Sequence, residues 1–495
     1  MYIGIDCGTQ GTKAVLWHEG HVLNTAYSPH HLIQDCSGRR EQSAIWWYEA
    51  MIASIHAMFV GFEEYKKEIK GIGISGQQHG LVLLDKNSEV ICDSLLWCDT
   101  RPQEVLKEFE KLNNLELSTL VGIEVPVAFT IAKLLWVKRN NPAAFRQIKY
   151  IMLPHEYLNY RLTHRYVVEP GDASGTGWFD TRTKSFSDKI FALLDLPQQF
   201  ELPSIINSDE VLGRVLPSIS EELGISSDVI VASGGGDNMM AAIGTGNVDS
   251  GVLTISLGTS GTAFSHSKHQ VDTDLFPDIN AFCSSTNGYL PLVSTMNVTT
   301  ANNQILKLIG KDIAVFDKLV DSAAIGAGGL RSVPFYNGAR LPNAPAAKGA
   351  LFGMNADNTN QQNFMRATVE AVTFNLTRGI NLLLEAGVDI EKVCVIGGGA
   401  NSKVWRQMIS DVTNLKLYAP TLTEAAAIGA AIQAFWAAEN DKGNRIDLSL
   451  LCQEFVHFNP QMTTEPDEIN HKKYAALLSE YNELVDWYLG SGYSH

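Results

Sequence analysis

The chain has 495 residues, of which 45% are hydrophobic and 19% are charged, a composition typical of a globular protein. Its formal net charge of -16 at pH 7 argues against nucleic acid and against an anionic membrane as partners, because both bind basic surfaces. The length exceeds what one hydrophobic core supports and predicts two large domains.

The start of the chain and its cysteines indicate a compartment. The sequence opens with an apolar strand and lacks the basic segment, apolar stretch and cleavage site of a secretory signal. No apolar run approaches the ~20 residues of a membrane span. Seven scattered cysteines with no C-x-x-C pair favour reduced thiols over a disulfide framework or a zinc site. We therefore expect a cytoplasmic protein.

The first predicted element is a β-hairpin over residues 2–17, in which apolar runs flank the turn Gly8-Thr9-Gln10-Gly11-Thr12. The backbone N–H groups of such a turn suit an anion such as phosphate. Asp6, at the end of the first strand, has the wrong charge for that role. Its position indicates a Mg²⁺ ion between carboxylate and phosphate. The alternative is an aspartate that only caps its own turn.

Regular elements follow along the chain. Apolar periodicity and β-forming residues predict a helix at 43–59, a strand at 70–76, a helix at 130–140 and a helix at 362–384. No Pro-rich or low-complexity linker separates these elements. We therefore expect the domains to be joined by a short hinge near Gly244-Thr245-Gly246.

The opening turn has a second copy. Residues 258–262 read Gly-Thr-Ser-Gly-Thr, which matches residues 8–12 at four of five positions, and the copy again lies between two apolar runs. The separation of 250 residues is about half the chain, as an internal duplication produces. The sequence therefore predicts two similar domains, residues 1–246 and residues 247–495.

Two glycine triplets extend the apparent repeat. Residues 229–244 and 393–408 both read as an apolar strand, three glycines and a helix, an arrangement that brings backbone N–H groups close to a ligand. Asp237 follows the first triplet where Ala400 follows the second, and Asp6 matches Ser256. Both carboxylates therefore belong to the first domain, and we expect an asymmetric cleft with acids on its N-terminal wall. Taken alone, Asp237 also fits a helix cap.

Several common enzyme motifs are absent from the sequence. The Gly310-Lys311 pair is followed by Asp312, so the chain has no P-loop. There is no G-x-S-x-G nucleophile elbow, and His155-Glu156 lacks the second histidine of a zinc-protease helix. Neither glycine triplet matches G-x-G-x-x-G, which argues against a dinucleotide oxidoreductase.

The motifs together resemble a known family. The pattern of Asp6-x-Gly8-Thr9, residues 257–261 (LGTSG) and residues 397–400 (GGGA) resembles the actin-like ATPase clan, and residues 349–354 (GALFGM), 363–370 (NFMRATVE) and 129–137 (FTIAKLLWV) resemble its FGGY-type carbohydrate kinases. The resemblance covers the whole chain. It implies an α/β fold of two duplicated actin-like (ribonuclease H-like) domains with a catalytic cleft between them.

The resemblance also implies a reaction. Residues 76–80 (GQQHG), 97–101 (WCDTR) and 234–238 (GGGDN) look most like those of bacterial xylulose kinases. The implied activity is the ATP-dependent phosphorylation of a pentulose, D-xylulose to D-xylulose 5-phosphate before others. Two segments differ: xylulose kinases commonly show Q-M-H-G at 77–80 and G-E-R-T-P at 338–342, where this chain has QQHG and GARLP. The exact sugar therefore stays open, with ribulose, a pentitol, glycerol or gluconate as alternatives.

The resemblance implies roles for individual residues, with ATP and Mg²⁺ as the cofactors and a homodimer as the assembly. Asp237 is expected to act as general base and Asp6 to orient Mg²⁺ on the phosphates. The expected binding residues are Gly8, Thr9, Gly258 and Thr259 for phosphates, Gly398, Gly399 and Ser402 for adenosine, and Gln78, His79 and Asn238 for sugar hydroxyls. A non-catalytic sugar sensor or a chaperone-type ATPase is the alternative class. A sensor is expected to have lost Asp6 or Asp237.

Overall fold

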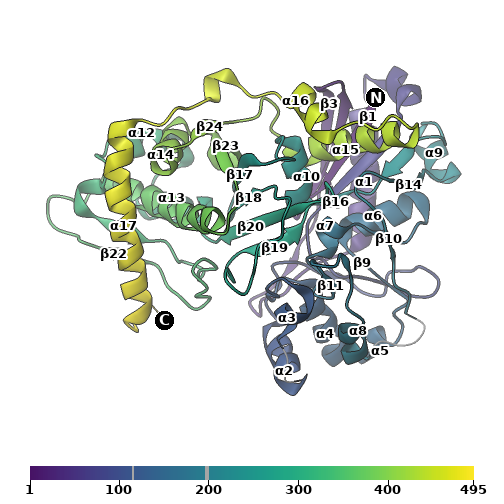
Figure 1. Ribbon diagram of the computed structural model, residues 1–495, viewed down its shortest axis with the longest axis horizontal. Helices are drawn as coiled ribbons and strands as arrows, with labels where there is room; N and C mark the ends of the chain where they lie inside the picture. Colours follow the sequence, from purple (N-terminus) through teal and green to yellow (C-terminus); the bar gives the residue numbers. More distant parts are fainter. Residues whose placement is uncertain (114–115, 196–199, 495) are drawn as a thin grey trace.

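The computed structural model describes residues 1–113, 116–195 and 200–494. It contains two large mixed sheets, one in each half of the chain (Figure 1). The first sheet has the strand order β14-β15-β6-β1-β2-β3, with β16 also paired to β6. Its strands are β1 (Tyr2–Cys7), β2 (Gly11–His18), β3 (His21–Pro29), β6 (Gly71–Gly76), β14 (Val211–Arg214), β15 (Ile230–Ala232) and β16 (Gly235–Gly236).

The second sheet has the order β19-β20-β18-β17-β23-β24. Its strands are β17 (Gly251–Leu257), β18 (Gly261–Ser265), β19 (Asn280–Cys283), β20 (Tyr289–Thr295), β23 (Ile390–Ile396) and β24 (Lys416–Tyr418). In each sheet the second strand of an antiparallel hairpin pairs antiparallel with a further strand, and the first strand of the hairpin pairs in parallel with another. This shared order confirms the duplicated α/β fold that the repeated turn predicted.

The second apparent repeat is wrong. Residues 234–236 follow β15, which pairs with β6 on the side away from β1. Residues 397–399 follow β23, which pairs in parallel with β17 and is therefore the counterpart of β6. The first glycine of each triplet lies close to neighbouring backbone. A Cβ on Gly397 would lie 2.9 Å from the carbonyl oxygen of Leu257, and one on Gly234 would lie 2.6 Å from that of Ile74. Local crowding, not equivalent position, explains the shared glycines.

Two helices cross between the sheets. Helix α15 (Ala425–Asp441), from the second half, packs on β1 and β6 of the first sheet and against α10 (Asp237–Gly244) (Figure 1). The contact is tight, because a Cβ on Gly73 would lie 1.9 Å from the carbonyl oxygen of Ala430. Helix α10 shares a hydrophobic cluster with Phe264 and Leu292 of the second sheet. The division of the chain at residue 246 stays a prediction, and the two halves interpenetrate through these helices.

The remaining helices pack near the sheets or on one another. Helices α1 (Ala44–Met58) and α6 (Pro154–Thr163) pack near the first sheet, and α13 (Gln361–Glu385), α14 (Lys403–Thr413) and α17 (Glu468–Gly490) pack near the second (Figure 1). The other helices are α2 (Gln103–Asn113), α3 (Leu117–Val121), α4 (Thr130–Asn140), α5 (Pro142–Phe145), α7 (Pro170–Ala173), α8 (Asp188–Leu194), α9 (Pro217–Leu223), α11 (Thr299–Leu308), α12 (Phe316–Asp321) and α16 (Leu448–Phe455). The predicted helices at 43–59, 130–140 and 362–384 are confirmed, as is the strand at 70–76.

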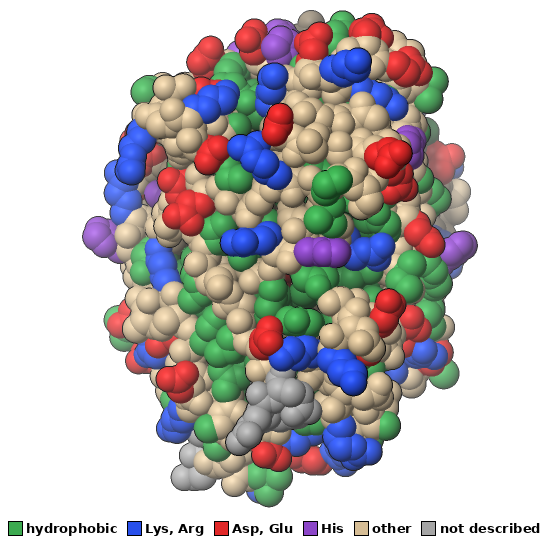
Figure 2. Space-filling model, turned by 90° about the vertical axis from the view of Figure 1, so that its right-hand side faces the viewer, with side chains coloured by type: hydrophobic (Ala, Val, Ile, Leu, Met, Phe, Trp, Pro, Cys, Tyr) green, Lys and Arg blue, Asp and Glu red, His purple; other side chains and the backbone are tan. Residues whose placement is uncertain are grey.

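The remaining strands are short and lie outside the two large sheets. They are β4 (Ile33–Gln34), β5 (Arg40–Gln42), β7 (Val82–Leu84), β8 (Ser94–Leu95), β9 (Tyr150–Met152), β10 (Val167–Val168), β11 (Phe179–Asp180), β12 (Ser185–Phe186), β13 (Ser204–Ile205), β21 (Arg331–Val333) and β22 (Ala350–Phe352). Figure 2 shows the face at the right of Figure 1, where acidic and basic side chains are interspersed. Within the described ranges, no helix is long and apolar enough to cross a membrane.

Candidate active site

Adjacent strands bring the two predicted carboxylates to one wall, which we call the N-terminal wall. Asp6 near the end of β1 is in register with Ser75 of β6, which is in register with Gly235 of β16. Asp237 begins α10 two residues later. Ser75 Oγ donates to Asp6 Oδ1 at 2.9 Å. The sheet therefore places both acids beside each other although 231 positions separate them.

Burial and nearby negative charges raise the pKa of both carboxyls of this pair. Burial is the main cause that raises the pKa of Asp237 to about 7, and the charges of Asp6 and Asp172 add to it. Burial likewise raises the pKa of Asp6 to about 6, against a lowering hydrogen bond from Ser75. Both side chains are only half-buried. A carboxyl whose pKa lies near neutrality exchanges protons readily at physiological pH.

A hydrogen-bonded amide network surrounds Asp237. The backbone N–H of Asn238 donates to Asp237 Oδ1 at 2.8 Å, and its side-chain amide donates to Gln78 Oε1 at 2.9 Å. From the second half, Thr262 Oγ1 donates to Asn238 Oδ1 at 3.0 Å. The structure thus brings Gln78, Asn238 and Asp237 together, as the sequence predicted. The side chains of Gln78 and Asn238, which are expected to bind sugar hydroxyls, are hydrogen-bonded to each other, and this bond fixes their positions.

His79 lies beside this network in an aromatic setting. Its ring centroid is 4.9 Å from that of Phe129 and 6.0 Å from that of Phe282, which belongs to β19 of the second half. The backbone of His79 has φ of 66°, in the left-handed region, and a Cβ on Gly175 would lie 2.1 Å from its Nδ1. His79 is 9% exposed, and its Nδ1 has no hydrogen-bond partner among the described residues. Its Nδ1 is buried against Gly175.

Sequence reasoning missed a buried acid–base pair behind the network. His155 Nδ1 lies 2.7 Å from Asp172 Oδ2, and both side chains are almost fully buried. Asp172 Oδ1 in turn accepts a 3.5 Å hydrogen bond from Gln78 Nε2. In the sequence, His155 is part of an incomplete zinc-protease motif, and Asp172 has no recognisable pattern around it. The pair supports Gln78 from behind and contributes negative charge near Asp237.

The opposite side of the site, which we call the C-terminal wall, begins with the second turn. The carbonyl oxygen of Gly258 accepts from the N–H of Thr299 and that of Thr259 from the N–H of Val298, both at 3.0 Å. In a trans peptide the C=O and N–H groups point in opposite directions. The N–H of Thr259, in the same peptide unit as the Gly258 carbonyl, is therefore directed away from these donors. This orientation suits the predicted phosphate role.

The glycine corner continues the C-terminal wall. Gly397 lies against Leu257, next to the second turn, and a Cβ on Gly398 would meet nothing within 4 Å. Ser402 caps α14 by accepting from the N–H of Trp405 at 3.1 Å, and it donates to Asp317 Oδ1 at 2.5 Å. Gly399 also lies against the side chain of Leu257, so the corner is adjacent to the second turn. Ser402 has a structural role as a helix cap, and Asp317 was not foreseen.

The first turn is held by hydrogen bonds within the first half, and the lysine that follows it contacts the second half. Thr9 Oγ1 donates to Gln77 Oε1 at 2.9 Å and accepts from the Trp97 indole at 3.1 Å, while the N–H of Gly8 donates to the carbonyl of Gly11 at 3.0 Å. Lys13, just after the turn, forms an ion pair with Glu424, the residue that precedes α15. Thus a cation near the turn is already paired with the second half.

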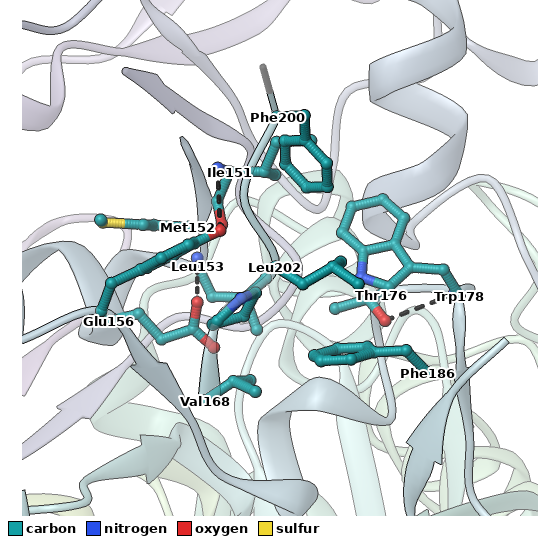
Figure 3. Close-up of a pocket in the computed structure, with 12 residues that line it drawn as sticks. Ile151, Met152, Leu153, Glu156, Val168, Thr176, Trp178, Phe186, Phe200 and Leu202 are labelled. Atoms are coloured by element: carbon teal, nitrogen blue, oxygen red, sulfur yellow. Dashed lines mark hydrogen bonds between the residues drawn. The ribbon is translucent and has the colours of Figure 1, made fainter. Parts of the chain in front are cut away.

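A small cavity lies beside the His155–Asp172 pair and is separate from the site. It has a volume of about 10 Å³, the room of one water molecule, and is lined mainly by apolar side chains (Figure 3). Glu156 is the carboxylate among its lining residues and accepts a hydrogen bond from the N–H of Leu153 at 2.9 Å. Burial raises the pKa of Glu156 to about 8. The cavity is too small for a substrate.

The donor set near the turns fits a magnesium ion held together with substrate. Mg²⁺ is usually bound by one or two carboxylates, with waters and phosphate oxygens filling its other positions. Asp6 is a half-buried carboxylate beside the first turn, and its charge contributes to the raised pKa of Asp237. Within the described ranges no cluster of three or more His, Cys, Asp or Glu side chains could hold a metal alone. The described residues of this wall could therefore bind a metal ion only together with substrate phosphates and water.

Known proteins share both the sequence and the architecture. Residues 1–244 match the N-terminal domain, and residues 253–438 the C-terminal domain, of the FGGY family of carbohydrate kinases. A xylulose kinase of Haemophilus influenzae is 41% identical over 97% of this chain and 98% of its own. Among solved structures, a xylulose kinase from Brucella ovis aligns with a TM-score of 0.90 at 28% identity, over 98% of each chain. A gluconate kinase from Lactobacillus acidophilus shares the fold, with a TM-score of 0.89 at 23% identity over 98% of each chain. The chain therefore belongs to the FGGY family of carbohydrate kinases.

Proposed function

We propose that the protein transfers the γ-phosphoryl group of ATP to D-xylulose and forms D-xylulose 5-phosphate and ADP. The observation that carries the proposal is the juxtaposition of Asp6 and Asp237 on one wall, which the second turn of the other half contacts through the hydrogen bond of Thr262 to Asn238. The likeness to xylulose kinases over nearly the whole chain supports this choice of sugar. A non-catalytic sensor is disfavoured because both acids are present.

At the sugar end, Asp237 is the proposed general base. With a pKa of about 7, about half of it is free of a proton at neutral pH and can accept one from the attacking hydroxyl. Gln78, His79 and Asn238 hold the neighbouring hydroxyls. The His155–Asp172 pair keeps Gln78 in position through the Asp172 hydrogen bond.

At the phosphate end, the turns at 8–9 and 258–259 bind the phosphates from opposite walls through backbone N–H groups. Asp6 would hold Mg²⁺, which supplies positive charge on the transferring phosphate. Gly398, Gly399 and Ser402 line the adenosine side, where Gly398 leaves open space. In such transfers the protein mainly positions the reactants and stabilises charge.

We further propose that residues 1–246 and 247–495 act as two domains that close on the substrates, because the acids and the adenosine glycines belong to different halves. The hinge is expected near residues 244–246, where α10 ends. The seven free cysteines fit a reducing compartment such as the cytoplasm.

A second candidate function is the phosphorylation of another ketose, polyol or sugar acid. The observation that favours it is the amide pair of Gln78 and Asn238, because an amide at position 78 adds donors and acceptors that select particular hydroxyls. The fold does not choose between these substrates, since a gluconate kinase shares it.

The proposal is tested by coupled ADP release with purified protein across D-xylulose, D-ribulose, pentitols, glycerol and gluconate. We expect the highest kcat/KM for D-xylulose, an absolute need for Mg²⁺, and a phosphorus NMR signal of a phosphate ester at the terminal carbon. A higher kcat/KM for another member of the panel would replace D-xylulose. Absence of ADP release with every sugar would reject the kinase assignment of the site.

A further inference from the structure

One cation of the second half lies at the N-terminal wall, and the proposed roles above do not use it. Arg340 is in the loop between β21 and β22. Ala339 and Ala344 of this loop exchange backbone hydrogen bonds of 2.9 and 3.0 Å, and the side chains of Ala339 and Leu341 are 3% and 2% exposed. Arg340 itself is exposed. Its neighbours anchor the backbone in the core of the second half and fix where the arginine side chain begins.

The guanidinium of Arg340 reaches the first half. Its Cζ lies 5.9 Å from the centre of the Trp97 ring, within the range of cation–π attraction. The Trp97 indole N–H donates to Thr9 Oγ1, so the ring is tied to the turn proposed for phosphate. His79 has a pKa well below its usual value, because of its burial first and then the charges of Lys133 and Arg340. Arg340 is therefore near both the phosphate turn and the sugar-binding histidine.

Other cations around the site are already engaged. Lys13 is paired with Glu424, and Arg101 donates to Asp99 Oδ1 at 3.0 Å and is also paired with Glu41. Lys133 is fully buried and donates to the carbonyl oxygens of residues 128 and 129. Across the described part of the chain, by contrast, Arg340 has neither an ion pair nor a hydrogen bond and meets the Trp97 ring alone. A guanidinium with its donors unused is ready for an incoming anion.

We propose that Arg340 binds the phosphoryl group as it reaches the sugar and holds the phosphate of the product. This inference rests on the proposed function. In the transfer, a sugar hydroxyl oxygen forms a bond to the γ-phosphorus while the bond between that phosphorus and the β,γ-bridging oxygen breaks. The electron pair of the broken bond goes to ADP, and the hydroxyl proton goes to Asp237. The transferred phosphoryl group is negatively charged and lies near the carboxylates of Asp6 and Asp237 during the transfer.

The chemistry of the group explains why an arginine suits this place. Asp6 and Asp237 repel a phosphate on the sugar, so the product needs positive charge on another side. A guanidinium offers paired N–H donors that match two phosphate oxygens. Because Arg340 comes from the second half and meets the first, its contribution also depends on the two halves being together. The sugar alone, which carries no charge, gains little from it.

The test compares the affinity of sugar and sugar phosphate in Arg340→Gln, Arg340→Lys and a matched control, Lys348→Gln. Lys348 is an exposed cation of the same loop, for which the structure shows no contact with Trp97. Calorimetry without nucleotide measures the Kd of the sugar and of its phosphate, and steady-state assays measure kcat. The sugar is the one that the panel above identifies, so that failure of D-xylulose as substrate is seen in the wild type, separately from the arginine result.

We expect Arg340→Gln to weaken binding of the sugar phosphate by about 10-fold to 100-fold, the range for losing a charged hydrogen bond, and to leave sugar affinity within about threefold. The kcat should fall by about 10². Arg340→Lys should restore part of both, and Lys348→Gln should change neither. Equal losses for sugar and sugar phosphate would make Arg340 a hydroxyl ligand and overturn the proposal. Unchanged phosphate affinity in a folded Arg340→Gln protein would also overturn it.

Discussion

Asp237→Asn is expected to stabilise the ligand-free protein, and to do so more at pH 8 than at pH 5. The pKa of Asp237 in the folded chain is about 7, against an ordinary value of 3.8, chiefly because of burial. In the unfolded chain the carboxyl is mostly ionised at pH 5 already. The folded state therefore binds more protons than the unfolded state between these pH values, and the wild type loses stability as the pH rises through about 7.

The size of the effect follows from the shift. One pKa unit corresponds to about 1.4 kcal/mol, and linkage over the interval from pH 5 to pH 8 gives a loss of about 2.6 kcal/mol in the free energy of unfolding. Because Asp237 is only half-buried, solvent screening reduces this to about 2 kcal/mol. Asparagine has no such titration, and it keeps the oxygen that accepts from the Asn238 N–H. The gain of the variant over wild type should therefore grow by about 2 kcal/mol from pH 5 to pH 8.

Urea unfolding of both proteins at pH 5 and pH 8, without nucleotide or metal, measures this difference. Asp228→Asn is the matched control, because it removes an exposed carboxylate of the same half. A difference between Asp237→Asn and wild type that is the same at pH 5 and pH 8 would refute the reasoning. It would mean that the folded structure does not disfavour the ionised form of Asp237.

Three further predictions concern the metal, the closure and the crossing helix. Asp6→Ala should lose most turnover and flatten the dependence of rate on Mg²⁺ concentration, and a variant with normal activity and a normal Mg²⁺ profile would contradict its metal role. Small-angle scattering should show compaction when sugar and a non-hydrolysable ATP analogue are both present, whereas identical profiles with and without ligands would argue against closure. Gly73→Ala should lower the free energy of unfolding by about 1–3 kcal/mol or more, because its Cβ would lie 1.9 Å from the Ala430 carbonyl oxygen. Gly490→Ala, which would meet nothing within 4 Å, is the control, and equal effects of the two changes would contradict the tight packing of α15.

The parts of the fold that were predictable are those set by local pattern. The hairpin at 2–17 and the helix at 362–384 follow from apolar periodicity, which a short window of sequence records. The repeated turn also revealed the duplication, because the same strand-turn-strand pattern occurs twice. The glycine triplets misled the comparison of the halves, since crowding by neighbouring backbone requires glycine at both places while their strands differ in position in the sheet.

The parts of the site that were not predictable depend on distant contacts. Lys13 and Glu424 are 411 positions apart in the chain, and Arg340 meets Trp97 only because the second half packs on the first. The His155–Asp172 pair has no sequence signature, because its two residues come from different helices, α6 and α7. Side chains that act on other side chains, rather than on a ligand through a fixed motif, leave no local pattern to find.

The most direct test of the central claim is the steady-state turnover of Asp237→Asn with D-xylulose and MgATP. The structure places Asp237 beside Asp6 within an amide network, and loss of a positioned general base lowers kcat by about 10²-fold to 10⁴-fold. We expect a fall in that range, toward its lower end because the transition state is loose, with ATP affinity nearly unchanged by calorimetry. Turnover within a few-fold of wild type would contradict the account, because Asp237 would then be a helix cap and the base would lie elsewhere.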